Sequence, residues 1–139
     1  MAELRKSRFS SELQVRPDDI DMNQHVHASR YFDFVLAARY DQMARCYKMS
    51  MEEFLRMGLG WFVRSFQIEY KRPLALGEWM VVTTWVEEME GESVRVNFEI
   101  CKKTNGKLAT EGHGVYTLVN LQTGRAETIP EAVLEKYSI

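Results

Sequence analysis

A single apolar helix pattern stands among five strand patterns, and this imbalance restricts the possible folds more than any other feature of the sequence. From about His27 or Ala28 to Tyr47, apolar residues recur at three- and four-residue steps, which predicts one long helix. The recurring residues are Ala28, Tyr31, Phe32, Val35, Ala38 and Met43, and Phe34 and Leu36 widen the apolar face. A helix that is apolar on several sides must be covered from more than one direction.

Strand patterns lie on both sides of this helix. The first covers Arg8–Arg16 and ends at Pro17, because proline donates no hydrogen bond to a sheet. Four more follow the helix, at Trp61–Tyr70, Glu78–Glu87, Ser93–Cys101 and Lys107–Asn120. Asn105-Gly106 predicts a hairpin between the last two strands. Short helices are predicted at Ser50–Met57, where Ser50 and Glu53 form a capping box, and at Pro130–Tyr137.

One helix cannot cover both faces of five long strands, but a sheet that curls around the helix can bury it. The sequence therefore predicts an α+β fold, a five-stranded antiparallel sheet wrapped around one long central helix, with the last four strands in a meander. We expect the edge strands to pair between two copies, Trp61–Tyr70 being the leading candidate, because soluble monomers seldom expose long apolar edges. No linker or repeat interrupts the 139 residues, so one domain is expected over residues 1–139.

The composition narrows the classes of partner and the location. The net charge of −2 gives no reason to expect nucleic acid or an anionic membrane as a partner. The apolar run Phe34–Ala38 is too short to span a bilayer, and the first ten residues lack the apolar stretch of a signal peptide. Cys46 and Cys101 are isolated, which predicts buried thiols in a reducing compartment. We expect a cytoplasmic protein without a metal site.

Chemically active side chains concentrate in Asp19–Tyr31, just before the long helix. This segment, which ends in Tyr31 and is followed by Ala38-Arg39, resembles the D-x-D-x-x-x-H-V-x-x-x-x-Y stretch of hotdog-fold thioesterases of the 4-hydroxybenzoyl-CoA thioesterase type. Phe62–Pro73 resembles the F-V-x-R…x-E-Y-x-x-P strand of the same family. The resemblance implies a hotdog fold and hydrolysis of an acyl thioester, either acyl-CoA or acyl-carrier protein, to a carboxylic acid and a free thiol.

The resemblance also implies roles for individual residues. Asp21 stands ten residues before Tyr31, where the family has its catalytic carboxylate, acting either as a general base or as a nucleophile. Ala28 occupies the position whose backbone N–H polarises the thioester carbonyl. Physical chemistry supports both roles, since a helix N-terminus presents unpaired N–H groups and partial positive charge to a developing oxyanion. A thiolate also leaves easily, so a complete catalytic triad is unnecessary.

The same segment resembles the D-x-D-x-N-x-H-V motif of plant acyl-ACP thioesterases, which implies catalytic roles for Asn23 and His25 as well. Those enzymes carry a glutamate and then a cysteine after the following strand, where this chain has Pro73 and Leu74. We therefore rank Asn23 and His25 below Asp21. The alternative interpretation of His25 is a side chain that only hydrogen-bonds the turn.

Substrate-binding residues are expected around this segment. Tyr31 belongs to the motif, and Arg64, Lys71 and Arg72 offer cations to the phosphates of coenzyme A, as do the hairpin lysines 102, 103 and 107. Some family members grip the nucleotide with basic residues where this chain has the acidic run 87–92. The methionines 43, 49, 51 and 57 either line an adaptable acyl pocket or pack in the core. No cofactor is expected beyond coenzyme A as part of substrate or product, and the expected assembly is a homodimer or homotetramer.

Two other functions compete with hydrolysis. A hotdog enoyl-thioester hydratase or dehydratase would show D-x-N-P-x-H or a related motif, but residues 21–25 lack the proline and are one residue shorter. A non-catalytic acyl-binding module would use the same cleft without any reaction.

Overall fold

The computed structural model describes residues 3–139 and contains five strands and three α-helices. The strands are β1 (Phe9–Gln14), β2 (Leu59–Tyr70), β3 (Trp79–Glu90), β4 (Ser93–Lys102) and β5 (Leu108–Asn120). The helices are α1 (Arg30–Arg45), α2 (Met51–Arg56) and α3 (Glu131–Tyr137), and a single 3-10 turn covers Pro17–Asp19. Every segment predicted from the sequence as helix or strand is therefore present.

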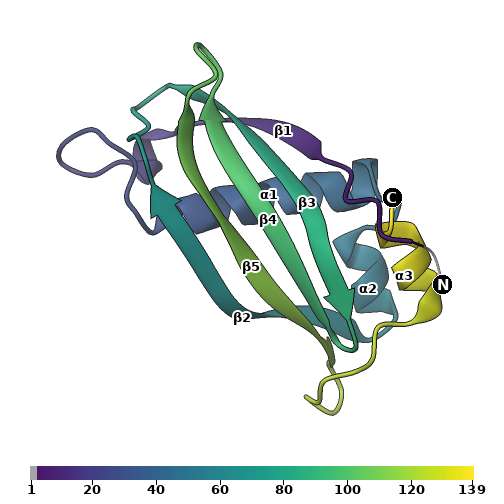
Figure 1. Ribbon diagram of the computed structural model, residues 1–139. Coiled ribbons are helices and arrows are strands. Elements are labelled where there is room, and N and C mark those ends of the chain that lie inside the picture. The colour runs from purple at the N-terminus through teal and green to yellow at the C-terminus, as the bar shows by residue number, and fades with distance from the viewer. Residues whose placement is uncertain (1–2) are drawn as a thin grey trace.

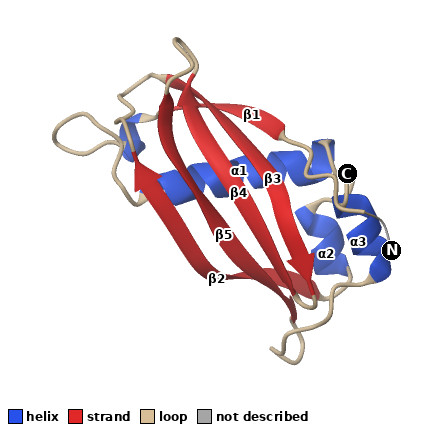
Figure 2. Ribbon diagram, viewed as in Figure 1, coloured by secondary structure: helices blue, strands red, loops and turns tan. Residues whose placement is uncertain are grey.

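The five strands form one antiparallel sheet in the order β1-β3-β4-β5-β2. Figures 1 and 2 show α1, which is 16 residues long, crossing one face of the sheet while the strands curve around it. The α+β architecture predicted from the sequence is confirmed. The predicted meander is wrong for one strand, because only β3, β4 and β5 are consecutive neighbours, whereas β2 pairs with β5 at the opposite edge.

The connection between β2 and β3 explains this strand order. After Tyr70 the backbone N–H groups of Lys71 and Arg72 both donate to the carbonyl of Ala109, which keeps the chain against β5. Leu74 is then fully buried in the core, so the connection crosses the end of the sheet instead of turning back as a hairpin. Burying Leu74 removes its side chain from water, which favours this crossing by about 2 kcal/mol.

Different elements gather at the two ends of the molecule. At one end the Asp21 loop and the β2–β3 connection lie beside the first turn of α1, and at the other end α2, α3 and both termini gather (Figure 1). α1 is shorter than predicted, beginning at Arg30 and ending at Arg45. The chain before it is extended, since His25 and Val26 pair in isolated bridges, and a turn closed by the Arg30 N–H on the His27 carbonyl leads into the helix.

The apolar core has two parts along α1. Near its N-terminus, the buried residues are Val15, Val26, Tyr31, Phe34, Val35, Ala38, Leu74, Met80, Val82, Phe98, Ile100 and Ala109. Near its C-terminus they are Met43, Tyr47, Met49, Phe54, Leu59, Val86, Val94, Val96, Tyr116, Leu118, Ile129, Val133 and Tyr137. The predicted alternation of β4 is confirmed, since its even-numbered residues 94–100 are all buried.

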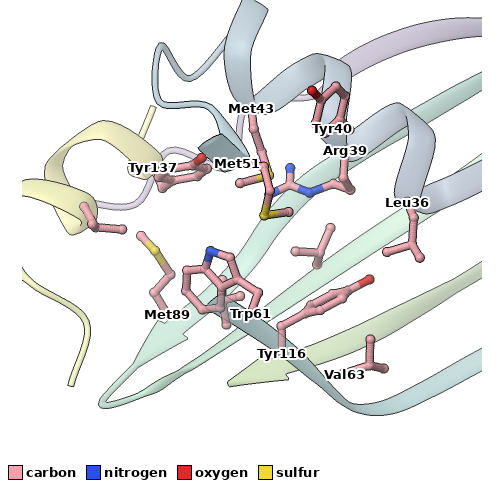
Figure 3. A pocket seen from close by; sticks show the side chains of 13 residues that line it. Leu36, Arg39, Tyr40, Met43, Met51, Trp61, Val63, Met89, Tyr116 and Tyr137 are labelled. Carbon is pink, nitrogen blue, oxygen red and sulfur yellow. The ribbon is translucent and has the colours of Figure 1, made fainter. Parts of the chain in front are cut away.

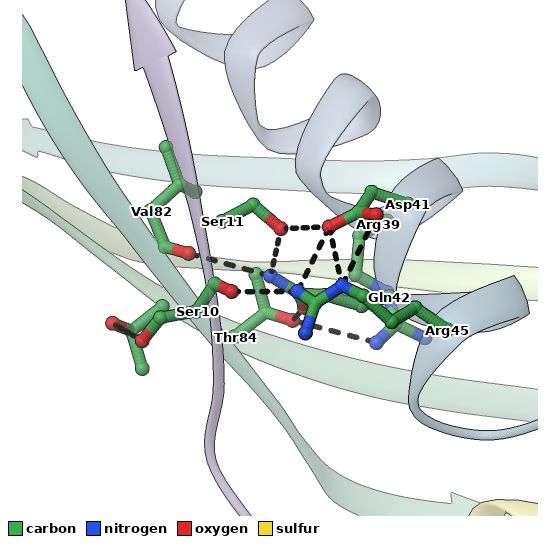
Figure 4. A network of polar contacts seen from close by, with 9 residues as sticks. Ser10, Ser11, Arg39, Asp41, Gln42, Arg45, Val82 and Thr84 are labelled. Atoms are coloured by element: carbon green, nitrogen blue, oxygen red, sulfur yellow. Dashed lines mark hydrogen bonds and ion pairs between the residues drawn. The ribbon is translucent and has the colours of Figure 1, made fainter.

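A buried polar network joins α1 to β1 and β3 (Figure 4). Gln42, fully buried, donates from Nε2 to the hydroxyl of Ser11 and to the carbonyl of Val82, at 3.0 and 3.3 Å. Its Oε1 accepts a hydrogen bond from the hydroxyl of Thr84. Because a buried amide without partners is costly, this network fixes the position of α1 over β1 and β3.

Two smaller findings concern the helices and the cysteines. No helix within residues 3–139 is long and apolar enough to cross a membrane. Cys46 and Cys101 are free thiols, as expected, but both are half-buried and not fully buried as the sequence had indicated.

Candidate active site

The motif segment forms a tight turn ahead of α1. The Asp21 N–H donates to the carbonyl of His25 at 2.8 Å, and the Gln24 N–H donates to the carbonyl of Asp21 at 3.0 Å. Gln24 has a positive φ of 63°, a left-handed conformation that closes the turn. Asp21 therefore lies at the base of the turn, and residues 22–24 form its exposed tip.

The β2–β3 connection holds this turn in place. The Val26 N–H donates to the carbonyl of Leu74 at 2.9 Å, and His25 pairs with Ala75 in an isolated antiparallel bridge. The Pro73–Ala75 segment therefore lies beside the motif, although some 50 residues separate the two in sequence. The proline that replaces the plant-type glutamate thus belongs to the scaffold of the site.

The Asp21 carboxylate is half-buried and oriented by backbone groups. Its Oδ1 accepts hydrogen bonds from the N–H of Asn23 at 2.8 Å and from the N–H of His25 at 3.3 Å. Within residues 3–139, Oδ2 has no hydrogen-bond donor. One carboxylate oxygen is thus fixed, and the other is free to contact a water molecule or a substrate.

Asn23 and His25 contact Asp21 through their backbones. Both side chains are exposed, and among the described residues neither forms a hydrogen bond. They hold the carboxylate with N–H groups that any residue except proline would supply. The geometry accordingly gives these two side chains no contact with the carboxylate.

The chain enters α1 through Ala28 and Ser29, where backbone donors are left over. Ser29 occupies the N-cap position but forms no side-chain cap. In the part of the chain that the structure describes, the Ala28 N–H has no acceptor, while the Ala28 carbonyl accepts from the Tyr70 hydroxyl at 2.8 Å. An unpartnered N–H at a helix N-terminus suits an anionic oxygen.

These groups line one shallow cleft of about 350 Å³. Its lining residues are Asp21, Val26, Ala28, Tyr31, Tyr70, Lys71, Arg72 and Pro73. The structure therefore brings together five of the residues that the sequence singled out, namely Asp21, Ala28, Tyr31, Lys71 and Arg72. Asn23 and His25 adjoin the cleft through their backbones.

Tyr31 and Tyr70 form an aromatic wall of the cleft. Their rings meet edge to face with centroids 5.4 Å apart. The buried Tyr31 hydroxyl accepts a hydrogen bond from the Leu74 N–H at 3.2 Å, and burial raises its pKa above the usual value for tyrosine. Tyr31 thus ties α1 to the β2–β3 connection and offers its ring, and not its hydroxyl, to the cleft.

Of the cations predicted to bind phosphate, Lys71 and Arg72 lie at the cleft, and Arg64 does not. Lys71 pairs with Glu69 at 2.9 Å, which raises the pKa of the Lys71 ammonium, and the Arg72 guanidinium donates to the carbonyl of Leu108 at 2.8 Å. Both are exposed at the rim of the cleft. Arg64 does not line it. It lies where the pairing of β2 with β5 shifts by one residue, near the middle of β2.

The third histidine belongs to the outer face of the sheet. His113 contacts the Arg95 guanidinium at 3.3 Å, and burial together with this cation lowers the pKa of its imidazole. Within residues 3–139, no three His, Cys, Asp or Glu side chains are grouped so that they could hold a metal ion.

A second cavity, of about 340 Å³, lies under the C-terminal half of α1 (Figure 3). It is lined by Leu36, Arg39, Tyr40, Met43, Met51, Trp61, Val63, Met89, Val94, Val96, Tyr116, Val133 and Tyr137. Of the four methionines considered from the sequence, Met43 and Met51 line it, Met49 packs in the core and Met57 is exposed.

Sequence reasoning missed Arg39 in this cavity. A signal existed, because Arg39 stands three residues after Leu36 and four before Met43, on the same apolar side of α1. Helical spacing therefore placed the arginine on a buried face, where an unpaired cation is unusual.

Similarity to known proteins agrees with the fold and the motif. Residues 15–137 match the family model of the thioesterase-like superfamily. The chain is 23% identical over 128 residues to the long-chain acyl-CoA thioesterase FadM of Escherichia coli strain K12, covering 92% of this chain and 96% of FadM. It is 29% identical over 84 residues to the acyl-[acyl-carrier-protein] hydrolase FATB3 of Cuphea viscosissima, which covers 60% of this chain but only 20% of that protein.

Among solved structures, the 1,4-dihydroxy-2-naphthoyl-CoA thioesterase from Synechocystis superposes with a TM-score of 0.83. The superposition covers 94% of this chain and 96% of that enzyme at 15% sequence identity, so it is a likeness of fold.

Proposed function

This chain belongs to the thioesterase-like superfamily, and from that premise we propose that it hydrolyses acyl-CoA thioesters to a carboxylic acid and free coenzyme A. The observation that carries the proposal is the cleft in which the Asp21 carboxylate and the unpartnered Ala28 N–H lie together. The similarity to FadM over nearly the whole length of both proteins supports coenzyme A as the thiol.

The Ala28 N–H is the proposed donor to the carbonyl oxygen of the thioester. As the carbonyl carbon becomes tetrahedral, its oxygen gains negative charge, and the N-terminus of α1 stabilises that charge. Removing one such donor typically slows an enzyme about 100-fold to 1,000-fold. The Tyr70 hydroxyl supports this donor indirectly, because it binds the carbonyl of the same residue.

The free Oδ2 of Asp21 can act in thioester hydrolysis either as a general base or as a nucleophile, and the proposal includes both routes. As a general base, it takes a proton from water while the water oxygen adds to the carbonyl carbon. The C–S bond then breaks, and the departing thiolate regains a proton. As a nucleophile, it bonds to the carbonyl carbon, expels the thiolate and leaves a mixed anhydride that water hydrolyses. Neither route needs a cofactor.

Asn23 and His25 are proposed as positioning residues. Their backbone N–H groups hold Oδ1, so Oδ2 stays directed away from the turn. This differs from the plant-type arrangement, in which the corresponding side chains are catalytic. Where that arrangement has its glutamate and cysteine, Pro73 lines the cleft and the Leu74 carbonyl holds the turn by accepting from the Val26 N–H.

Lys71 and Arg72 are the proposed contacts for the phosphates of coenzyme A, because they lie at the rim of the Asp21 cleft. A phosphate would compete with Glu69 for Lys71 and would use the free donors of Arg72. Arg64 reaches a cleft only in a dimer. It lies near the centre of Leu59–Tyr70, where two β2 strands would pair around a two-fold axis.

We propose that β2 is the dimer edge. It is an edge of the sheet and carries three large exposed apolar side chains, Phe62 at 58%, Val63 at 44% and Tyr70 at 51% exposure. Antiparallel pairing of β2 with its copy places the Tyr70 end of one strand beside the Leu59 end of the other. Each Asp21 cleft would then adjoin the second cavity of the partner subunit.

We also propose that this protein is located in the cytoplasm.

The deciding experiment is a panel of acyl-CoA esters with a thiol-detecting reagent, run on the wild type and on Asp21→Asn. We expect thiol release by the wild type and at least a 100-fold lower rate for the variant. A hydratase would consume enoyl-CoA without releasing thiol, and an acyl-binding module would retain the esters unchanged. Either result would contradict the proposal.

A further inference from the structure

Arg39 is a buried cation without a carboxylate partner. Arg39 is only 9% exposed, and within residues 3–139 it forms no ion pair. Of its five N–H donors, one reaches the hydroxyl of Thr84, at a long 3.4 Å. The guanidinium also lies 5.3 Å from the centre of the Tyr47 ring. Burying a charge with so few partners is unfavourable, so a function must compensate for it.

The polar network behind Arg39 does not supply the missing acceptors. The Thr84 hydroxyl donates onward to Gln42, which donates to Ser11, which donates to Asp41 at 2.6 Å (Figure 4). Asp41 itself is bound to Arg45 at 2.9 Å, on the outer side of α1. Every bond in this series is directed away from Arg39, so its remaining donors face the second cavity.

The second cavity is apolar at its mouth and has two polar groups inside, the Arg39 guanidinium and the Tyr116 hydroxyl. At its mouth, Leu36, Tyr40 and Val63 are 39%, 55% and 44% exposed, respectively. Figure 3 shows the Arg39 guanidinium extending from α1 into the cavity, on the side of Met43 and Met51. The Tyr116 hydroxyl, also in the lining and buried, has no hydrogen-bond partner within residues 3–139.

We propose that this cavity binds the far end of the acyl chain and that this end carries a carboxylate, so the substrates are ω-carboxyacyl thioesters. The inference rests on the proposed function. The methylene chain would pack against the apolar lining, and its terminal carboxylate would accept from the Arg39 fork and from the Tyr116 hydroxyl. A methyl terminus would leave both groups unpaired in an apolar cavity, which disfavours an unsubstituted chain.

The position of the cavity indicates a chain and not a short acyl group. In the β2-paired dimer, Trp61 and Val63 at the mouth belong to the Leu59 end of the strand, which faces the other subunit's Asp21 cleft. The thioester and the terminal carboxylate would therefore be bound at opposite ends of an extended chain.

The test compares pairs of CoA esters that have the same chain length and either a methyl or a carboxylate terminus. The measured quantity is the ratio of the two kcat/KM values, taken over a series of lengths by thiol release. We expect the wild type to favour the ω-carboxyacyl ester by about tenfold to 100-fold at the best length. In Arg39→Met, which keeps the length of the side chain but loses its charge, the ratio should fall to about one or below.

Arg45→Met is the matched control, because Arg45 is another arginine of α1 that is half-exposed and outside the cavity. Its ratio should equal that of the wild type. If Arg39→Met fails to fold, Tyr116→Phe removes only a hydroxyl and should lower the ratio by up to about tenfold.

A wild type that prefers the methyl-terminated ester, or a ratio that both variants leave unchanged, would overturn the inference while leaving the hydrolase intact. If neither ester releases thiol at any length, the proposed function fails and this inference falls with it.

Discussion

Replacing Asp21 in two ways separates its chemical role from its structural one. In Asp21→Asn the amide oxygen can still accept from the N–H groups of Asn23 and His25, so the turn keeps both hydrogen bonds. Only the negative charge and its basicity are lost. In Asp21→Ala the charge and the two accepted hydrogen bonds are lost together.

The two substitutions should have similar effects on kcat but different effects on the stability of the fold. A general base typically contributes 100-fold to 10,000-fold, so both variants should lose at least 100-fold in kcat, or about 2.7 kcal/mol of barrier. Each hydrogen bond contributes about 1 kcal/mol, and water at this exposed turn replaces part of that. We expect Asp21→Ala to lose about 1 kcal/mol, equivalent to roughly 4 °C in Tm, while Asp21→Asn stays close to the wild type.

Thiol release under single-turnover conditions and thermal unfolding monitored by circular dichroism give the two readouts. Equal losses of activity with unequal losses of Tm would support a carboxylate that reacts. An Asp21→Asn protein with kcat within tenfold of the wild type would refute the reasoning, because an amide is not basic enough to replace the carboxylate. Activity that follows Tm through the series would show that Asp21 only caps the turn.

Three further predictions concern the positioning residue, the edge strand and the buried network. His25→Ala should lower kcat by no more than about tenfold, because its contact with Asp21 is made by a backbone N–H that alanine retains. A loss above 1,000-fold in a folded variant would instead support the plant-type mechanism. Sedimentation should give at least twice the 16.3 kDa of one chain, and Phe62→Lys should weaken the association; a fully active wild-type monomer would contradict the β2 dimer. Hydrogen bonds from Arg45 and Ser11 lower the pKa of Asp41, so this carboxylate stabilises the fold above its unfolded pKa of about 3.9 and loses that effect as the pH falls through the folded value. The difference in Tm between wild type and Asp41→Asn should therefore be constant above about pH 5 and shrink in more acidic buffer, and a difference independent of pH would show that the charge of Asp41 does not matter.

The local pattern of the chain was readable because short-range rules control it. Alternation in Ser93–Cys101 predicted a half-buried strand, and Ser50 predicted the start of α2, where its hydroxyl accepts from the Glu53 N–H at 3.3 Å. The boundaries were less accurate where distant segments compete for the backbone. α1 begins later than predicted because bridges to Ile20 and Ala75 hold His25 and Val26 in an extended conformation, and a turn from His27 to Arg30 follows.

The site was partly readable for the same reason. The spacing from Asp21 to Tyr31 carried the family resemblance, and the turn that it describes is local. Sequence analysis considered the side chains of Asn23 and His25 from the plant-type motif and ranked them below Asp21 because Pro73 and Leu74 depart from it, whereas the structure shows that their backbones contact the carboxylate. It grouped Arg64 with Lys71 and Arg72, although the middle of β2 is far from its C-terminal end.

The sequence by itself determined which segments are helix and strand, which faces are apolar and where the Asp21 carboxylate lies relative to a helix start, because each depends on periodicity and neighbours a few residues apart. Only the tertiary structure decided the strand order, which places β2 at an edge, and the surroundings of Arg39, which lines a cavity together with residues from six other elements. Side-chain type and spacing do not specify which distant segments will meet. That choice is made when the β2–β3 connection crosses the sheet and buries Leu74, which also brings Pro73 and Ala75 to the Asp21 turn.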